Sequence, residues 1–88
     1  MKIVARPIDA AVLFRGKEPP LPRSFRFQEE RDGERITVRV EHVFDMEQTN
    51  VAGAPAFVYR CQSQIGEVMK PYELRYFVKE CRWELYKI

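Results

Sequence analysis

The fold of this chain is decided by its C-terminal stretch, Tyr72-Glu-Leu-Arg-Tyr-Phe-Val-Lys-Glu-Cys-Arg-Trp-Glu-Leu-Tyr-Lys-Ile88. A two-residue turn at Lys79-Glu80 would make this stretch a β-hairpin. Cross-strand pairs of apolar, aromatic or oppositely charged residues each contribute roughly 0.2–1 kcal/mol. One register gives such pairs on both faces: Val78 with Cys81, Tyr76 with Trp83 and Leu74 with Leu85 on one, and Arg75 with Glu84 on the other. The stretch therefore predicts two antiparallel strands.

A helix is the alternative interpretation of the same stretch. Its apolar residues also fall at a heptad-like spacing, and Pro71 would suit the first turn of a helix. The density of Tyr, Phe, Trp and Val favours strands. A helix would also scatter Tyr72, Tyr76, Trp83 and Tyr86 over other faces, so the hairpin is preferred.

A second hairpin is predicted between Phe25 and Val43. Asp32-Gly33 is typical of a type I′ turn, because both central residues of that turn need a positive φ. Pairing across the turn gives these partners: Arg31 with Glu34, Glu30 with Arg35, Gln28 with Thr37, Phe27 with Val38, Arg26 with Arg39 and Phe25 with Val40. Two directly opposed arginines repel, so we expect Arg26 and Arg39 to splay apart or to share an anion.

The secondary structure of the remaining segments is predicted from their prolines and from the alternation of apolar and polar residues. Residues 3–14 predict one interrupted strand or two short ones, with Pro7 at an edge or a bend. Residues 16–24 predict a stiff proline-rich connector, although Pro19 and Pro22 also have the PxxP spacing of an SH3 ligand. Residues 45–55 lack a clear period and predict a long loop or a short helical turn. Along residues 56–65, side chains alternate between two faces as they do in a strand, which predicts a strand there.

These elements together predict an all-β, mainly antiparallel fold. The 88 residues form a single domain, 1–88, as a strongly bent sheet or small open barrel of about five to seven strands. The expected core residues are Val12, Phe14, Phe25, Phe27, Val38, Val40, Phe57, Tyr59, Cys61, Leu74, Tyr76, Trp83 and Leu85.

The net charge and the distribution of apolar residues limit the functional classes to which the protein can belong. A formal net charge of +2 does not by itself indicate a nucleic-acid-binding protein. No apolar run approaches the ~20 residues that span a bilayer, and Arg6, Pro7 and Asp9 interrupt any signal-peptide core. We therefore expect a cytoplasmic protein without a membrane partner, whose two cysteines, Cys61 and Cys81, are reduced thiols.

Catalytic and metal-binding patterns are weak. His42 is the single histidine, and no nucleophile elbow, CxxC or HExxH motif is present. A metal site would need His42, Cys61 and Cys81 with a carboxylate such as Asp45, but structural zinc ligands usually come in closely spaced pairs. The cysteines fit better as small core residues. We expect no enzymatic activity, no metal and no cofactor.

A mixed arginine and aromatic surface is the candidate binding site. A sheet face of this kind can stack bases and neutralise phosphates, as single-stranded nucleic acid requires. Alternatively, the arginines pair with Glu73 and Glu84, and the exposed aromatics and the proline-rich edge contact a protein partner or a second copy. The candidate residues are Arg26, Arg39, Arg60, Arg75, Phe77, Arg82 and Tyr86.

Three segments carry a resemblance to known proteins: Val58-Tyr-Arg-Cys-Gln-Ser63, Tyr72-Glu-Leu-Arg-Tyr76 and Cys81-Arg-Trp-Glu-Leu-Tyr-Lys-Ile88. In these segments the chain resembles short, uncharacterised bacterial β-rich proteins that form a domain of unknown function. Over about residues 25–88 it is also loosely similar to the small C-terminal domain of Y-family-polymerase-like mutagenesis proteins, in the order Phe25-Arg-Phe27, Val38, His42-Val43, Tyr59-Arg60, Tyr72-x-Leu74 and Arg82-Trp-x-Leu85. The resemblance implies a β-rich accessory or interaction domain, near DNA repair, and supplies no catalytic residues.

Overall fold

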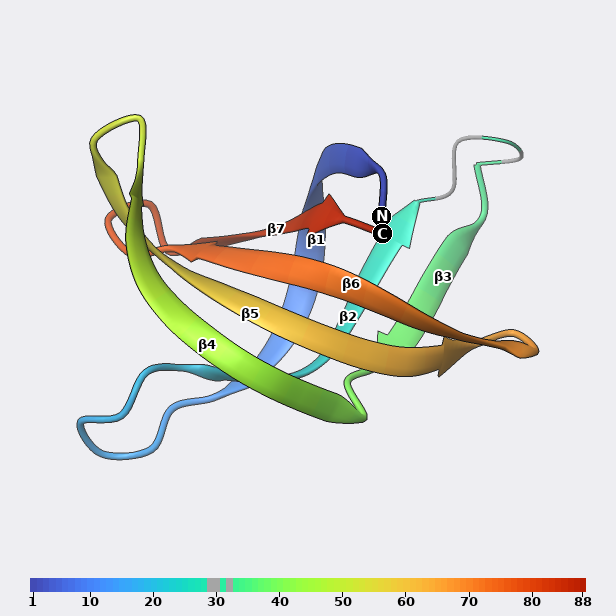
Figure 1. The fold of residues 1–88 in the computed structure, drawn as a ribbon, viewed down its shortest axis with the longest axis horizontal. Coiled ribbons are helices and arrows are strands. Elements are labelled where there is room, and N and C mark those ends of the chain that lie inside the picture. The colour runs from blue at the N-terminus through green and yellow to red at the C-terminus, as the bar shows by residue number, and fades with distance from the viewer. Residues whose placement is uncertain (29–30, 32) are drawn as a thin grey trace.

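The computed structural model describes residues 1–28, 31 and 33–88. These residues form seven strands and no helix (Figure 1), which confirms the all-β prediction. The strands are β1 Ile3–Leu13, β2 Leu21–Gln28, β3 Arg35–Arg39, β4 His42–Val51, β5 Ala54–Ile65, β6 Val68–Phe77 and β7 Arg82–Lys87.

All seven strands belong to one antiparallel sheet in the order β3-β2-β1-β7-β6-β5-β4. The first and last strands meet inside this order, and two backbone hydrogen bonds extend their contact: Lys2 N to Ile88 O at 2.8 Å and Ile88 N to Lys2 O at 3.0 Å. The sheet curls on itself (Figure 1), so that β3 also contacts β5. The result is a half-barrel whose two edges are β3 and β4.

The C-terminal hairpin has the predicted register. Tyr76 pairs with Trp83, Leu74 with Leu85 and Arg75 with Glu84. Strand β6 already ends at Phe77, so Val78 and Cys81 belong to the turn and are not a strand pair. The helical alternative is wrong, because this stretch contains most of β6 and all of β7, which pair with each other.

The second hairpin exists, but its predicted register is wrong by two residues. Phe25 pairs with Val38, Phe27 with Ile36, Arg26 with Thr37, Gln28 with Arg35, and Ser24 with Arg39. The connection between β2 and β3 is longer than the two-residue turn that was predicted, and Glu29, Glu30 and Asp32 lie outside the described residues. Because a shift of two residues keeps every side chain on its face, the two faces were predicted correctly.

The segment expected to be a loop or a helical turn is a strand. β4 occupies most of residues 45–55 and joins β5 through Ala52-Gly53, with φ of 49° and 85°. Positive φ at both central residues is the geometry of a type I′ turn. Nearly all side chains of β4 are exposed, so its sequence lacks the apolar alternation that reveals a strand.

Strand β1 has the interruptions that its sequence predicts. Its pairing is irregular between Ile3 and Arg6 and between Ala11 and Val12, and Ala5 has a φ of 44°. Pro7 pairs with β7, whereas pairing with β2 begins at Asp9. Pro7 therefore lies where β1 has one strand neighbour, as its missing N–H requires.

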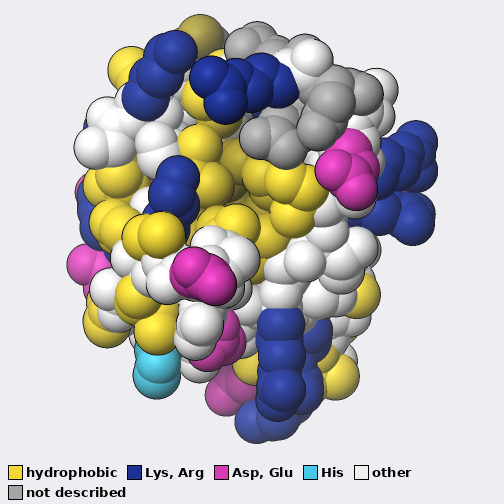
Figure 2. Space-filling model, turned by 90° about the vertical axis from the view of Figure 1, so that its right-hand side faces the viewer, with side chains coloured by type: hydrophobic (Ala, Val, Ile, Leu, Met, Phe, Trp, Pro, Cys, Tyr) yellow, Lys and Arg dark blue, Asp and Glu magenta, His cyan; other side chains and the backbone are white. Residues whose placement is uncertain are grey.

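The core lies inside the curl and is rich in aromatic rings. Trp83 lies between Tyr76 and Tyr59, with ring centroids 4.9 and 5.3 Å away. At one side of the curl, apolar side chains reach the surface between lysines and arginines (Figure 2). Eight of the expected core residues are buried (Phe25, Val38, Tyr59, Cys61, Leu74, Tyr76, Trp83 and Leu85), and four are half-buried (Val12, Phe27, Val40 and Phe57).

Phe14 was wrongly assigned to the core. Its side chain is 64% exposed, because Phe14 follows the last residue of β1 and touches Tyr76 only edge-on, with ring centroids 6.5 Å apart.

Candidate functional site

The outer face of β5, β6 and β7 brings five of the seven candidate residues together: Arg60, Arg75, Phe77, Arg82 and Tyr86. Arg60 is surrounded by carboxylates, with distances of 2.9 Å to Asp45, 3.2 Å to Glu47 and 3.6 Å to Glu73. Hydrogen bonds to Asp45 and then to Glu47 raise the pKa of Arg60. Its positive charge is therefore already shared among acidic neighbours.

Two arginines lie over the aromatic rings of this face. The guanidinium carbon of Arg75 is 3.2 Å from the Tyr86 ring centroid, and that of Arg82 is 4.2 Å from the Phe77 centroid. Both arginines also lie near Glu84, at 3.8 and 3.7 Å. Phe77 is 5% exposed, so it is buried and not exposed as expected.

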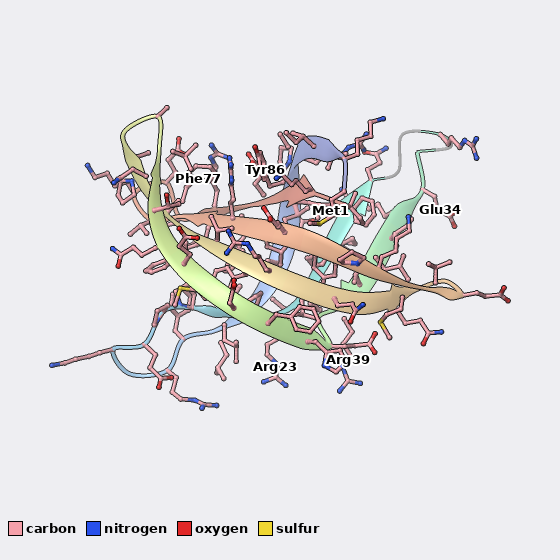
Figure 3. The ribbon with its side chains drawn as sticks, viewed as in Figure 1. Met1, Arg23, Glu34, Arg39, Phe77 and Tyr86 are labelled. Atoms are coloured by element: carbon pink, nitrogen blue, oxygen red, sulfur yellow. The ribbon has the colours of Figure 1, made fainter. Side chains whose placement is uncertain are left out.

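Arg26 and Arg39 lie apart from the other five residues. They belong to β2 and β3, at the opposite end of the strand order. Arg26 is 3.4 Å from the carboxylate of Asp9, and Arg39 pairs with Ser24, so the two arginines are not directly opposed. Figure 3 shows Arg39 on one side of the view and Phe77 and Tyr86 on the other. The seven residues therefore form two separate groups.

A cavity of about 480 Å³ lies beside the arginines of the outer face. Its lining includes Glu47, Thr49, Arg60, Glu73, Arg75 and Tyr86. The cavity is polar and contains both signs of charge, so it is not a purely cationic groove.

The free edge of β4 is a feature that the sequence did not reveal. Within the described ranges, this ten-residue strand pairs with β5 alone. Its two faces differ, because Asp45 and Glu47 point to the outer face with Arg60, whereas Val43 and Met46 line a cavity on the other side. The pairing shifts between Val43 and Asp45, which places Phe44 at a bulge.

The cavity on the inner side of β4 is mainly apolar. We call it the apolar groove. It has a volume of about 280 Å³ and lies between β4 and the proline-rich loop, residues 14–20, which connects β1 to β2. Arg15 and Glu18 add charge to its lining, and Tyr59 contributes a hydroxyl group that donates a hydrogen bond to Pro20 O. Its apolar lining comprises Leu13, Pro19, Pro20, Leu21, Val43 and Met46.

The proline-rich loop is a packed connector in this structure. Pro20 and Pro22 are buried, and Pro22 pairs with Val12 in the sheet. A PxxP ligand would need Pro22 to be accessible, so the geometry favours the connector over the SH3-ligand alternative.

The residues considered for catalysis and metal binding are not assembled into one site. His42 is exposed and stacks on Phe44, with ring centroids 6.3 Å apart. Cys61 is buried, and burial followed by the nearby Asp45 raises the pKa of its thiol to about 12. Cys81 is exposed in the last turn. Across residues 1–28, 31 and 33–88, no three His, Cys, Asp or Glu side chains group as metal ligands would.

Comparisons of this chain with protein-family models, with curated proteins and with solved structures find no match. The resemblance to the small C-terminal domain of polymerase-like mutagenesis proteins therefore stays a prediction. In the part of the chain that the structure describes, no helix is long and apolar enough to cross a bilayer. The fold defines the protein as a small all-β domain with one curled sheet.

Proposed function

We propose that the protein is a non-catalytic binding module that recognises an extended segment of another protein along β4. The free edge of β4, next to the apolar groove, is the observation that carries this proposal. An edge strand presents a row of N–H and C=O groups that a further strand can pair with. In strand addition, these main-chain hydrogen bonds supply affinity, and pockets for alternate side chains supply specificity.

The exposure of the β4 side chains that line the groove supports this mode of binding. An added strand lies about 4.8 Å from its neighbour, and alternate side chains of that strand point to the same face. Val43 and Met46 are 37% and 39% exposed, so both can contact a bound segment without rearrangement of the core. The side chains of the segment that lie beside Val43 and Met46 would then face the apolar groove.

A peptide-display selection on the folded protein tests the proposal. We expect selected peptides to be extended and to slow amide hydrogen exchange in β4. Met46→Asp places a charge beside the groove and should weaken their binding at least tenfold. Val68→Asp is the matched control, because Val68 is 54% exposed in β6 and outside the groove. Failure to select any peptide, or equal binding to Met46→Asp, would reject strand addition.

Single-stranded nucleic acid on the outer face is the second candidate function. The stacking of Arg75 on Tyr86 and of Arg82 on Phe77 favours it, because guanidinium planes can stack on bases. The carboxylates of Glu73 and Glu84 oppose it, because they neutralise part of the positive charge.

Fluorescence anisotropy with single-stranded oligonucleotides distinguishes the two candidates. Nucleic-acid binding predicts an affinity that falls steeply as salt rises. Substituting Arg75→Gln together with Arg82→Gln should then weaken binding more than Met46→Asp does. The pair Arg26→Ala and Arg39→Ala reports on the second arginine group. Absence of binding at low salt would remove this candidate.

A further inference from the structure

The outer side of β4 carries two carboxylates whose negative charge one ion-paired arginine balances only in part. Asp45 and Glu47 are the charged residues of the strand, which contains no Lys or Arg. Both carboxylates share the single guanidinium of Arg60 with Glu73. The side chains of Asp45 and Glu47 are each 58% exposed, so they remain accessible to a further cation.

The other side of the same strand is apolar at Val43 and Met46, whereas Gln48, the next residue on that side, is polar. Val43 and Met46 line the apolar groove with Leu13, Leu21 and the two neighbouring prolines. A strand added to β4 would present alternate side chains to these two sides. One set would meet apolar atoms, and the other set would meet Asp45 and Glu47.

These charges also disfavour pairing with a second copy of this chain in the register centred on Met46. Two antiparallel β4 strands centred on Met46 would place Asp45 of one copy opposite Glu47 of the other. Like charges directly opposed across a strand pair are destabilising. Charged residues on an edge strand commonly block such self-pairing.

We infer that the segment bound along β4 alternates apolar residues with Lys or Arg. Its apolar residues enter the apolar groove, and its basic residues pair with Asp45 and Glu47. The inference rests on the strand addition proposed above and adds the chemistry of the partner.

Three synthetic octapeptides test the inference by calorimetry on the full chain. In each, Val and Leu alternate with one polar residue, which is Lys, Gln or Glu. We expect the Lys peptide to bind about tenfold more tightly than the Gln peptide at low salt, and the Glu peptide to bind least. The Lys preference should shrink at high salt, because salt screens exposed charges.

Asp45→Asn combined with Glu47→Gln should remove the preference for Lys and leave binding of the Gln peptide unchanged. Glu80→Gln is the matched control, because Glu80 is also 58% exposed but pairs with Arg82 in the last turn. A thermal midpoint within about 3 °C of the wild type would show that each variant is folded.

The outcomes separate the two proposals. If the Lys and Gln peptides bind equally well and both lose affinity for the Met46→Asp variant, the inference of a basic partner is overturned. The proposal of strand addition to β4 would stand in that case. A Lys preference that survives the double substitution would also overturn the role of Asp45 and Glu47. If none of the three peptides binds and no peptide can be selected by display, both proposals fail.

Discussion

The hydroxyl group of Tyr59 donates a hydrogen bond to the carbonyl oxygen of Pro20, which lies 39 residues earlier in the chain. This bond ties the proline-rich loop to β5 and fixes one wall of the apolar groove. Burial, and then the neighbouring Tyr76 and Cys61, raise the pKa of Tyr59 well above its ordinary value. Tyr59 therefore keeps its proton at neutral pH and remains a donor.

Tyr59→Phe should lower the free energy of unfolding by about 1–3 kcal/mol, because it leaves the buried acceptor without its donor. Urea denaturation measures this change. Tyr86→Phe, which removes a hydroxyl group from a half-buried ring on the outer face, is the control and should cost less than about 0.5 kcal/mol. Equal effects of the two substitutions would mean that the bond to Pro20 contributes nothing.

Trp83→Ala should be the most destabilising truncation in the chain. Trp83 contacts Tyr59 and Tyr76 in the core, and deletion of a buried Trp costs roughly 3–5 kcal/mol. For a domain of this size, that loss approaches the whole stability. Val68→Ala, at an exposed position of β6, should leave the thermal midpoint almost unchanged. An unchanged midpoint in Trp83→Ala would contradict the position of the core.

Ala52→Asn should stabilise the protein by about 0.5–1 kcal/mol. Ala52 has a φ of 49°, a left-handed conformation that is unfavourable for Ala and better tolerated by Asn. The change also creates the Asn-Gly pair that type I′ turns prefer. Ala11→Asn, at an exposed strand position, should not stabilise. Thermal unfolding of both variants measures the change in midpoint, and equal changes would count against backbone strain at Ala52.

Stability should fall between about pH 9 and 12. Burial raises the pKa of Cys61 from 9.0 to about 12 and that of Tyr72 from 10.0 to about 12. The unfolded chain therefore loses these protons first, so the stabilising contribution is complete below pH 9 and is lost as the pH rises to 12. Each group contributes up to about 1.4 kcal/mol per pH unit.

Urea denaturation at pH 8 to 11 measures this slope. Cys61→Ala should flatten the first part of the fall, whereas Val68→Ala, which removes no titratable group from an exposed position, should keep the slope of the wild type. A free energy of unfolding that stays constant from pH 9 to 11 would show that neither buried group titrates differently in the folded state.

The sequence predicted strand pairing correctly where a short turn connects two strands in which apolar and polar residues alternate. The pairs of β6 and β7 followed from a short turn flanked by alternating apolar residues. The register of β2 and β3 did not follow, because their connection is longer than Asp32-Gly33 alone suggested. Phe14 was misplaced because apolar character does not show where a strand ends.

The placement of the candidate residues on the sheet was predicted in part. Five residues of the outer face share one side of β5–β7, as strand alternation predicted, and the pairing of Arg75 with Glu84 was visible in the sequence. The edge of β4 was not predicted, since its exposed residues have no apolar period and Phe44 sits at a bulge that shifts the alternation. Ala52-Gly53 between Val51 and Ala54 was the available turn signal.

The pairing of Lys2 with Ile88 has a consequence for how the protein is made. β1 is synthesised before the other strands of the sheet, whereas its partner β7 is synthesised after them. Until then, the growing chain carries β1 and β6 with unpaired edges, which favours aggregation or capture by a chaperone. Closure between distant segments also slows folding. The native sheet can therefore be completed only after β7 has been synthesised.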